Sequence, residues 1–157
     1  MIRTFLDVLG FTVHFSTAFH PFSASPQHVL VILHSPKGWV LTKHKERGLE
    51  FPGGKREEGE TIEQAAIREV WEETGGVIEK LHYIGQYVVE DTRHPFVKDI
   101  FFAHAASIEM KKDYLETNGP VIMDELPAQF NEEEYSYIMR DQVVKLSLQV
   151  IKEKQLI

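Results

Sequence analysis

Short apolar stretches separated by polar turns mark the first two thirds of the chain. Phe11 to Phe15 alternates apolar and polar residues, which predicts a strand with one buried face. Val29 to Leu33 is apolar throughout and rich in β-branched residues, which predicts a fully buried strand. Further strands are predicted at 39–42, 83–90, 100–105 and 121–123, with a short extended piece from 49 to 54 and loops at 20–27, 91–98 and 111–120.

The stretch from Thr61 to Thr74 has the pattern of a helix. Thr61 is a good N-cap, and Gln64, three residues later, completes a capping box. Gly75 and Gly76 then supply a stop signal. The sequence therefore predicts one well-delimited helix near the middle of the chain.

A second helical segment is predicted at about 131–153. Asn131 is followed by three glutamates, which is typical of a helix start because acids favour the positive end of the helix dipole. Ile138, Val144 and Ile151 then place an apolar stripe on one or two helices. Together these elements predict a single mixed α/β domain, of the α+β class, over residues 1–157.

Length, charge and composition exclude several functional classes. The chain of 157 residues has no cysteine, which excludes disulfides, thiolate metal sites and a cysteine nucleophile. Its formal charge of −7 argues against a protein that wraps duplex DNA, since that needs a basic face. No apolar run reaches the roughly 18 residues of a membrane span, and no signal peptide is visible. We therefore expect a cytoplasmic protein with no membrane and no duplex-DNA partner; its oligomeric state is left open.

The predicted helix carries unusual chemistry on one face. Ile62, Ala65 and Ala66 share a face that we expect to pack inward, and the same face continues with Glu69, Glu72 and Glu73. Three carboxylates beside a core repel one another, so they are either protonated or bridged by hard cations such as Mg²⁺. Arg68 precedes Glu72 by four residues and can neutralise or orient an acid. The alternative is a solvated charged helix face.

Two glycines lie just before this helix. Gly53 and Gly54 permit a close approach of the backbone to a ligand, and a free carbonyl there can ligate a metal ion. Lys55 follows and can meet a phosphate oxygen as a point charge. Taken alone, Pro-Gly-Gly is an ordinary turn.

The joint spacing of these groups resembles a known family. Segment 54–76 matches the Nudix box, written G-x5-E-x7-R-E-U-x-E-E-x-G-U with U apolar, through Gly54, Glu60, Arg68, Glu69, Val70, Glu72, Glu73 and Gly75. The last position departs from the pattern, because Gly76 stands where the family has an apolar residue.

The Nudix resemblance implies an α/β/α sandwich with a mixed sheet, in which the box forms a loop, a helix and a loop. It also implies hydrolysis of a nucleoside diphosphate linked to a further moiety, with Mg²⁺ or Mn²⁺ as cofactor. Carried onto this chain, the metal ligands would be Glu69, Glu72, Glu73 and the Gly53 carbonyl. Arg68 would orient the carboxylates, and Glu60 would lie near the site.

The segment 49–55 resembles the MutT-type nucleoside triphosphatases, and the whole chain is similar to their bacillary YtkD-like branch. That resemblance implies conversion of oxidised purine triphosphates such as 8-oxo-dGTP to monophosphate and pyrophosphate, a nucleotide-pool and DNA-repair role. Phe51 would then lie close to the base and Lys55 close to phosphate.

Several alternatives stay open at this point. The substrate could be the triphosphate at an RNA 5′ end, a dinucleoside polyphosphate or ADP-ribose, and a nucleotide sensor without turnover is a reading of a different class. Glu69, Glu73 and Arg68 are the expected catalytic residues, and the general base could be Glu69 or an acid outside the box, with Glu109 and Glu116 of the later loop as candidates.

Overall fold

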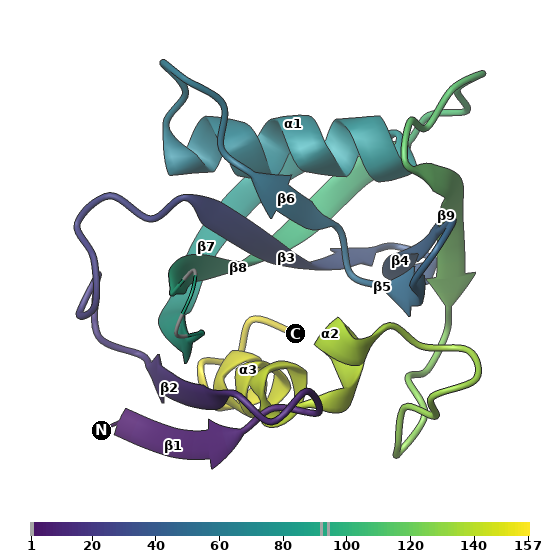
Figure 1. Ribbon diagram of the computed structural model, residues 1–157. Coiled ribbons are helices and arrows are strands. Elements are labelled where there is room, and N and C mark those ends of the chain that lie inside the picture. Colours follow the sequence, from purple (N-terminus) through teal and green to yellow (C-terminus); the bar gives the residue numbers. More distant parts are fainter. Residues whose placement is uncertain (1, 92, 94) are drawn as a thin grey trace.

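The computed structural model describes residues 2–91, 93 and 95–157, in which a mixed sheet lies between helices (Figure 1). Within these residues the sheet has nine strands, in the order β1-β2-β7-β8-β3-β4-β5, with β6 paired to β3 and β9 paired to β4. Strands β3 and β8 are parallel and the other pairs are antiparallel. The strands are β1 (Ile2–Leu6), β2 (Thr12–Ser16), β3 (His28–Ser35), β4 (Gly38–His44), β5 (Gly48–Glu50), β6 (Gly53–Lys55), β7 (Gly76–Glu90), β8 (Phe96–Ile108) and β9 (Thr117–Met123).

Helices cover the two faces of the sheet. Helix α1 (Ile62–Thr74) lies on one face, and α2 (Tyr137–Arg140) and α3 (Gln142–Glu153) lie on the other (Figure 1). Each face buries its own core. The α1 side holds Val29, Val31 and Leu33 of β3, and the opposite side holds Leu30 and Ile32 of the same strand. This alternation along a central strand confirms the predicted α/β/α sandwich.

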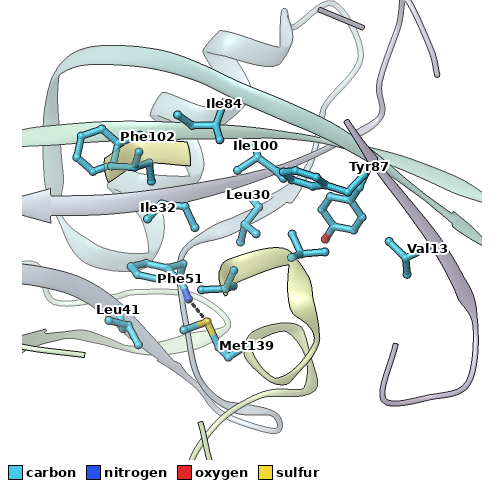
Figure 2. Packing of buried hydrophobic residues seen from close by; sticks show 14 of the residues in the cluster. Val13, Leu30, Ile32, Leu41, Phe51, Ile84, Tyr87, Ile100, Phe102 and Met139 are labelled. Carbon is cyan, nitrogen blue, oxygen red and sulfur yellow. Dashed lines mark hydrogen bonds between the residues drawn. The ribbon is translucent and has the colours of Figure 1, made fainter. Parts of the chain in front are cut away.

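The larger core joins β3 and β8 to the C-terminal helices. Phe51, Phe102 and Met139 are among its most buried side chains, and the Phe51 N–H lies 3.4 Å from the Met139 sulfur (Figure 2). This contact ties the segment between β5 and β6 to α2. The chain before the central helix is therefore held in place by residues more than eighty positions away.

Helix α1 forms where the sequence predicts it. The Thr61 side chain accepts the Gln64 N–H, the Gln64 side chain accepts the Thr61 N–H, and Gly75 ends the helix in the left-handed conformation. Ile62, Ala65 and Ala66 are buried, as expected from the helical pattern. The capping residues thus fix both ends of the segment that carries the glutamates.

Several element boundaries differ from the sequence prediction. Strand β1 is not anticipated, β7 begins at Gly76 rather than at 83, and β9 begins at Thr117, inside the predicted loop. The loop predicted at 91–98 is shorter, because β8 begins at Phe96; residues 92 and 94 lie outside the described residues. Long-range pairing with β8, which the local pattern cannot show, extends β7 at its start.

The helix start predicted at Asn131 is wrong. The Asn131 side chain accepts the Glu134 N–H at 2.8 Å, but this closes a turn and not a helix. The Leu49 backbone then intervenes, because its N–H donates to Glu134 O and its carbonyl accepts the Ser136 N–H. The first helix of this segment begins only at Tyr137. None of the helices in the described part of the chain is long and apolar enough to cross a membrane.

Candidate functional site

The two glycines of β6 bring the backbone against α1. The Gly53 N–H donates to Glu73 Oε1 at 2.9 Å, so strand and helix are linked at the point where the glutamates lie. A Cβ on Gly53 would overlap the Val29 carbonyl, and a Cβ on Gly54 would overlap the Glu69 carboxylate. The space that a side chain would fill at Gly54 is therefore taken by the carboxylate of Glu69.

Arg68 gathers the surrounding carboxylates. Its Nε lies 2.7 Å from Glu60 Oε2, and its Nη1 lies 3.0 Å from Glu69 Oε1 and 3.1 Å from Glu72 Oε2. Its Nη2 donates to the Lys55 carbonyl at 3.0 Å. One guanidinium thus fixes two glutamates of α1, the glutamate of the preceding loop and the end of β6, and the orienting role expected for Arg68 stays a prediction.

The glutamates occupy different electrostatic environments. Glu73 is 5% exposed, and burial raises the pKa of its carboxyl to about 8, against the opposing hydrogen bond from Gly53. Burial likewise raises the pKa of Glu69 to about 7, although Arg68 opposes the shift. The hydrogen bond from Arg68 holds the pKa of Glu60 below its ordinary value. Two neighbouring acids, Glu69 and Glu73, therefore resist ionisation, which is costly unless a cation shares the site.

The donor set fits a hard divalent cation by its chemistry. Glu69, Glu72 and Glu73 offer carboxylate oxygens, the ligands that Mg²⁺ prefers. Among the described residues, no three acidic or histidine side chains are already placed to hold an ion. The geometry gives the reason, since Glu69 and Glu72 are turned toward Arg68. Arg68 engages Oε1 of Glu69 and Oε2 of Glu72, so the second oxygen of each carboxylate could turn to a cation while the guanidinium keeps its hydrogen bonds.

A cavity of about 580 Å³ opens beside these groups. Its wall includes Gly53, Gly54, Arg68, Glu69 and Glu73, but not Glu72. The structure therefore brings together most of the residues that the sequence singles out, and places them at one end of a space large enough for a nucleotide.

The two residues expected to contact the substrate, Lys55 and Phe51, differ in their exposure to solvent. Lys55 is exposed and lines the cavity. Phe51 also borders the cavity but is only 1% exposed, and its ring packs edge-on against Trp39 at 6.2 Å between centroids. Phe51 is thus a residue of the core (Figure 2) that borders the cavity, and its contact with a base stays a prediction.

The two loop acids are separated by the fold. Glu116 lines the cavity and its charge acts on Glu69, which makes it a neighbour of the carboxylate cluster. Glu109 is not part of the cavity wall; its N–H donates to the Gly75 carbonyl just after α1. Only Glu116 of this pair has a position from which it could take a proton near the cluster.

Sequence reasoning assigned no role in the site to several residues of the cavity wall. Among them are Glu50 of β5, His28 of β3, Phe96 and Lys98 of β8, and Tyr137 and Ile138 of α2. Glu50 is 2% exposed, and both of its oxygens accept from the Arg47 guanidinium, at 3.0 and 2.9 Å. Arg47 precedes the short strand β5 and lies three residues before Glu50, a spacing that is only a weak signal for such a pair. Nothing local shows that the C-terminal segment folds back over the cavity.

Comparison with known proteins gives consistent matches. The family model described as NUDIX domain matches residues 24–125. The chain is 46% identical over 150 residues to the Bacillus subtilis protein named putative 8-oxo-dGTP diphosphatase YtkD, covering 95% of each chain. It is 37% identical over 83 residues to the mouse oxidized purine nucleoside triphosphate hydrolase, covering 50% of this chain and 53% of that one.

Among solved structures, the fold matches a crystal structure of a mutant of the Bacillus subtilis pyrophosphohydrolase BsRppH, with a TM-score of 0.94 and 45% identity, covering 97% of each chain. The NUDIX domain of Shewanella oneidensis NrtR, in complex with ADP ribose, matches with a TM-score of 0.59 at 15% identity, covering 87% of this chain and 94% of that one. The second match shows a shared fold alone.

Proposed function

Because the chain belongs to the NUDIX family, we propose that it is a pyrophosphohydrolase that cleaves the phosphoanhydride of a purine nucleoside triphosphate and releases pyrophosphate. The observation that supports this most directly is the burial of Glu73 and the partial burial of Glu69 against the Gly53-Gly54 backbone, at the edge of a nucleotide-sized cavity. A surface charge cluster would need neither the burial nor the glycines.

In this proposal the carboxylates of Glu69, Glu72 and Glu73 and the carbonyl of Gly53 would hold a divalent cation, Mg²⁺ or Mn²⁺. When bound, such an ion would neutralise the substrate phosphates and activate a water for in-line attack. Arg68 keeps the carboxylates together and orients them, through the hydrogen bonds that it makes to Glu69 and Glu72.

The remaining roles follow from position. Glu69, Glu73 or Glu116 could take the proton of the attacking water, since all three border the cavity. Lys55, exposed at the cavity rim, would contact a phosphate oxygen. Phe51 would support the base end of the cavity from below.

Metal binding should release protons and gain strength as the pH rises. Metal ligands must be ionised, but the pKa values of Glu69 and Glu73 are raised to about 7 and about 8. We expect the apparent Mg²⁺ affinity to increase roughly tenfold between pH 6 and pH 7 for each proton displaced. Calorimetric titration of Mg²⁺ in buffers of different ionisation enthalpy measures both quantities; proton-neutral binding would contradict the assignment.

Whereas metal affinity should rise with pH, the stability of the metal-free protein should fall. Folding raises the pKa of both carboxyls above the ordinary value of 4.5, so the native state binds more protons than the unfolded state between about pH 4.5 and pH 8. Stability therefore falls as the pH rises through that window. Burial lowers the pKa of His28 to about 4, which acts in the reverse direction below about pH 6.5. Thermal unfolding in EDTA between pH 7 and pH 8 follows mainly the glutamates, because the histidines whose pKa burial lowers are then mostly neutral in both states, and added Mg²⁺ should remove the decline.

Two substrate classes fit the proposed reaction: oxidised purine nucleotides and triphosphorylated RNA 5′ ends. The relatives named 8-oxo-dGTP diphosphatase favour an oxidised purine nucleotide, which would give the enzyme a cytoplasmic role in nucleotide-pool sanitation and DNA repair. The high similarity to BsRppH favours a pyrophosphohydrolase that also accepts triphosphorylated RNA 5′ ends. Both substrates present the same triphosphate to the same carboxylates.

Product identification tests the proposal. With Mg²⁺, 8-oxo-dGTP should yield monophosphate and pyrophosphate directly, and triphosphorylated RNA should compete for the same site. Orthophosphate as the first product would contradict the assigned bond. Binding of nucleotide and Mg²⁺ without turnover of any triphosphate, ADP-ribose or dinucleoside polyphosphate would favour a sensor instead.

A further inference from the structure

A row of side chains crosses the sheet on its α2/α3 face. In the strand register Tyr87 of β7 lies opposite Lys98 of β8, Lys98 lies opposite His28 of β3, and His28 lies opposite Lys55 of β6. Tyr87 belongs to the core on the α2/α3 side, and directly paired residues share a face, so all four point to that side (Figure 2 labels Tyr87). Lys98, His28 and Lys55 all line the cavity.

Lys98 places its ammonium group at this cavity, and no hydrogen-bond acceptor or ion-pair partner for it lies among the described residues. Within residues 2–91, 93 and 95–157, its ammonium makes neither a hydrogen bond nor an ion pair; it lies 5.8 Å from the ring centres of both Tyr87 and Phe96. Two acids act on it only from a distance, Glu50 and Asp141. Lys98 is partly buried, and burial lowers its pKa. A desolvated donor group with no acceptor is costly, which indicates that an acceptor arrives with the ligand.

Both neighbouring acids are already engaged. Glu50 accepts two hydrogen bonds from Arg47, and Asp141 caps α3 by accepting the Val143 N–H at 2.8 Å. These bonds hold both carboxylates in place, and among the described residues neither forms an ion pair with Lys98. The donors of Lys98 are therefore directed to whatever occupies the cavity.

The surroundings of Lys98 suit a planar aromatic ligand. Phe96 packs against His28 with 5.2 Å between ring centroids, and both line the cavity. Burial and the charges of Lys98 and Lys55 lower the pKa of His28 to about 4, so its ring is neutral at pH 7. In this part of the wall two flat, uncharged rings lie beside the Lys98 ammonium, an arrangement that fits a heterocyclic base better than a phosphate.

The row also sets the orientation of a nucleotide. Neighbouring strands are 4.7–4.9 Å apart, so the backbones at Lys98 and Lys55, two strands apart, are separated by about 10 Å. At the Lys55 end of the row, the Lys55 carbonyl accepts a hydrogen bond from Arg68, and Arg68 also donates to the Glu69 carboxylate. Phosphates at the Lys55 end therefore place the base near Lys98.

We propose that Lys98 is a specificity-determining residue that donates a hydrogen bond to the 6-carbonyl oxygen of a purine base, so that the cavity prefers 6-oxopurines to 6-aminopurines. The inference rests on the proposed triphosphatase function. An ammonium has donors only, so it pairs with a carbonyl oxygen and cannot accept from an exocyclic amine. Guanine and 8-oxoguanine share this carbonyl, so Lys98 separates both from adenine and does not separate them from each other.

The wild-type protein provides the first test. The kcat/KM values with Mg²⁺ are compared for dGTP and dITP, which carry the 6-carbonyl, and for dATP and 2,6-diaminopurine deoxyriboside triphosphate, which carry a 6-amino group. We expect the 6-oxo pair to exceed the 6-amino pair by about tenfold or more, whatever stands at position 2. Equal values, or a ranking that follows position 2, would overturn the proposal.

Variants of Lys98 provide the second test. Lys98→Met keeps the length and removes the donors, so it should bring the 6-oxo to 6-amino ratio close to one while leaving kcat/KM for dATP within about threefold. Lys98→Arg should retain the preference, and Lys152→Met, an exposed change on α3, should alter nothing. A loss shared equally by all four substrates, or an unchanged ratio, would contradict the assignment.

The two proposals fail separately. If the wild-type protein hydrolyses none of the four triphosphates, the proposed function fails, and calorimetric dissociation constants for the same four triphosphates still decide the role of Lys98. If dATP turnover persists in Lys98→Met and the base preference does not change, the function stands and the base contact fails.

Discussion

Replacing Glu73 or Glu69 with glutamine is expected to lower the turnover rate by about 100-fold or more. Glutamine keeps the shape of the side chain and removes the charge that a divalent ion requires. Glu73 is the more buried of the two and accepts the Gly53 N–H, so its replacement removes a ligand from the centre of the site. Steady-state rates at saturating Mg²⁺ and substrate measure the effect.

The control lies on the same helix. Glu63 is an exposed residue of the first turn of α1, so Glu63→Gln changes the same residue type without touching the cavity. It should leave turnover within about twofold. In EDTA at pH 8 the Glu73→Gln protein should unfold at the same temperature as the wild type or higher, because a buried repelling acid has become neutral. Full activity in both glutamine variants would contradict the role of the cluster.

Adding one methyl group at Gly54 should have an effect almost as large. A Cβ at this position would overlap the Glu69 carboxylate, which is the movable end of a flexible side chain. The fold should therefore survive with a stability change of about 1 kcal/mol or less, while displacement of Glu69 lowers turnover by about 10- to 100-fold. Activity and thermal unfolding measured on the same preparation of Gly54→Ala separate the two effects.

The neighbouring glycine supplies the contrast. A Cβ on Gly53 would meet the backbone carbonyl of Val29, which is fixed in the central strand and cannot turn aside. Gly53→Ala should therefore cost about 3 kcal/mol of stability or prevent folding. If Gly54→Ala kept wild-type turnover, Glu69 would not need its present position, and the account of the site would be wrong in that respect.

Local signals in the sequence were sufficient for the helix and its chemistry. Thr61, Gln64 and Gly75 act through contacts within a few residues, so the ends of α1 could be predicted without the fold. The helical spacing of Glu69, Glu72 and Glu73 likewise predicts that these carboxylates share one face of α1, whereas their meeting with Gly54 and Glu60 is implied by the resemblance to the Nudix box. Glu116 was one of two candidates, and only the fold separates it from Glu109.

What the sequence did not reveal depends on long-range pairing. Lys98 faces the same cavity as Lys55 only because β8 pairs with β3 and β3 with β6 in one particular register. A shift of one residue would turn Lys98 to the other face of the sheet. The false helix start at Asn131 has a similar cause, since the distant Leu49 backbone takes the hydrogen bonds that would have continued the helix. Tyr137 and Ile138 reach the cavity for the same reason.

Anomalous diffraction from crystals grown with Mn²⁺ and a non-hydrolysable triphosphate analogue tests the central claim most directly. The account predicts manganese peaks about 2 Å from carboxylate oxygens of Glu69, Glu72 or Glu73, with the Gly53 carbonyl turned toward the ion and the phosphates on its other side. Manganese bound elsewhere, with these glutamates still hydrogen-bonded to Arg68, would contradict it.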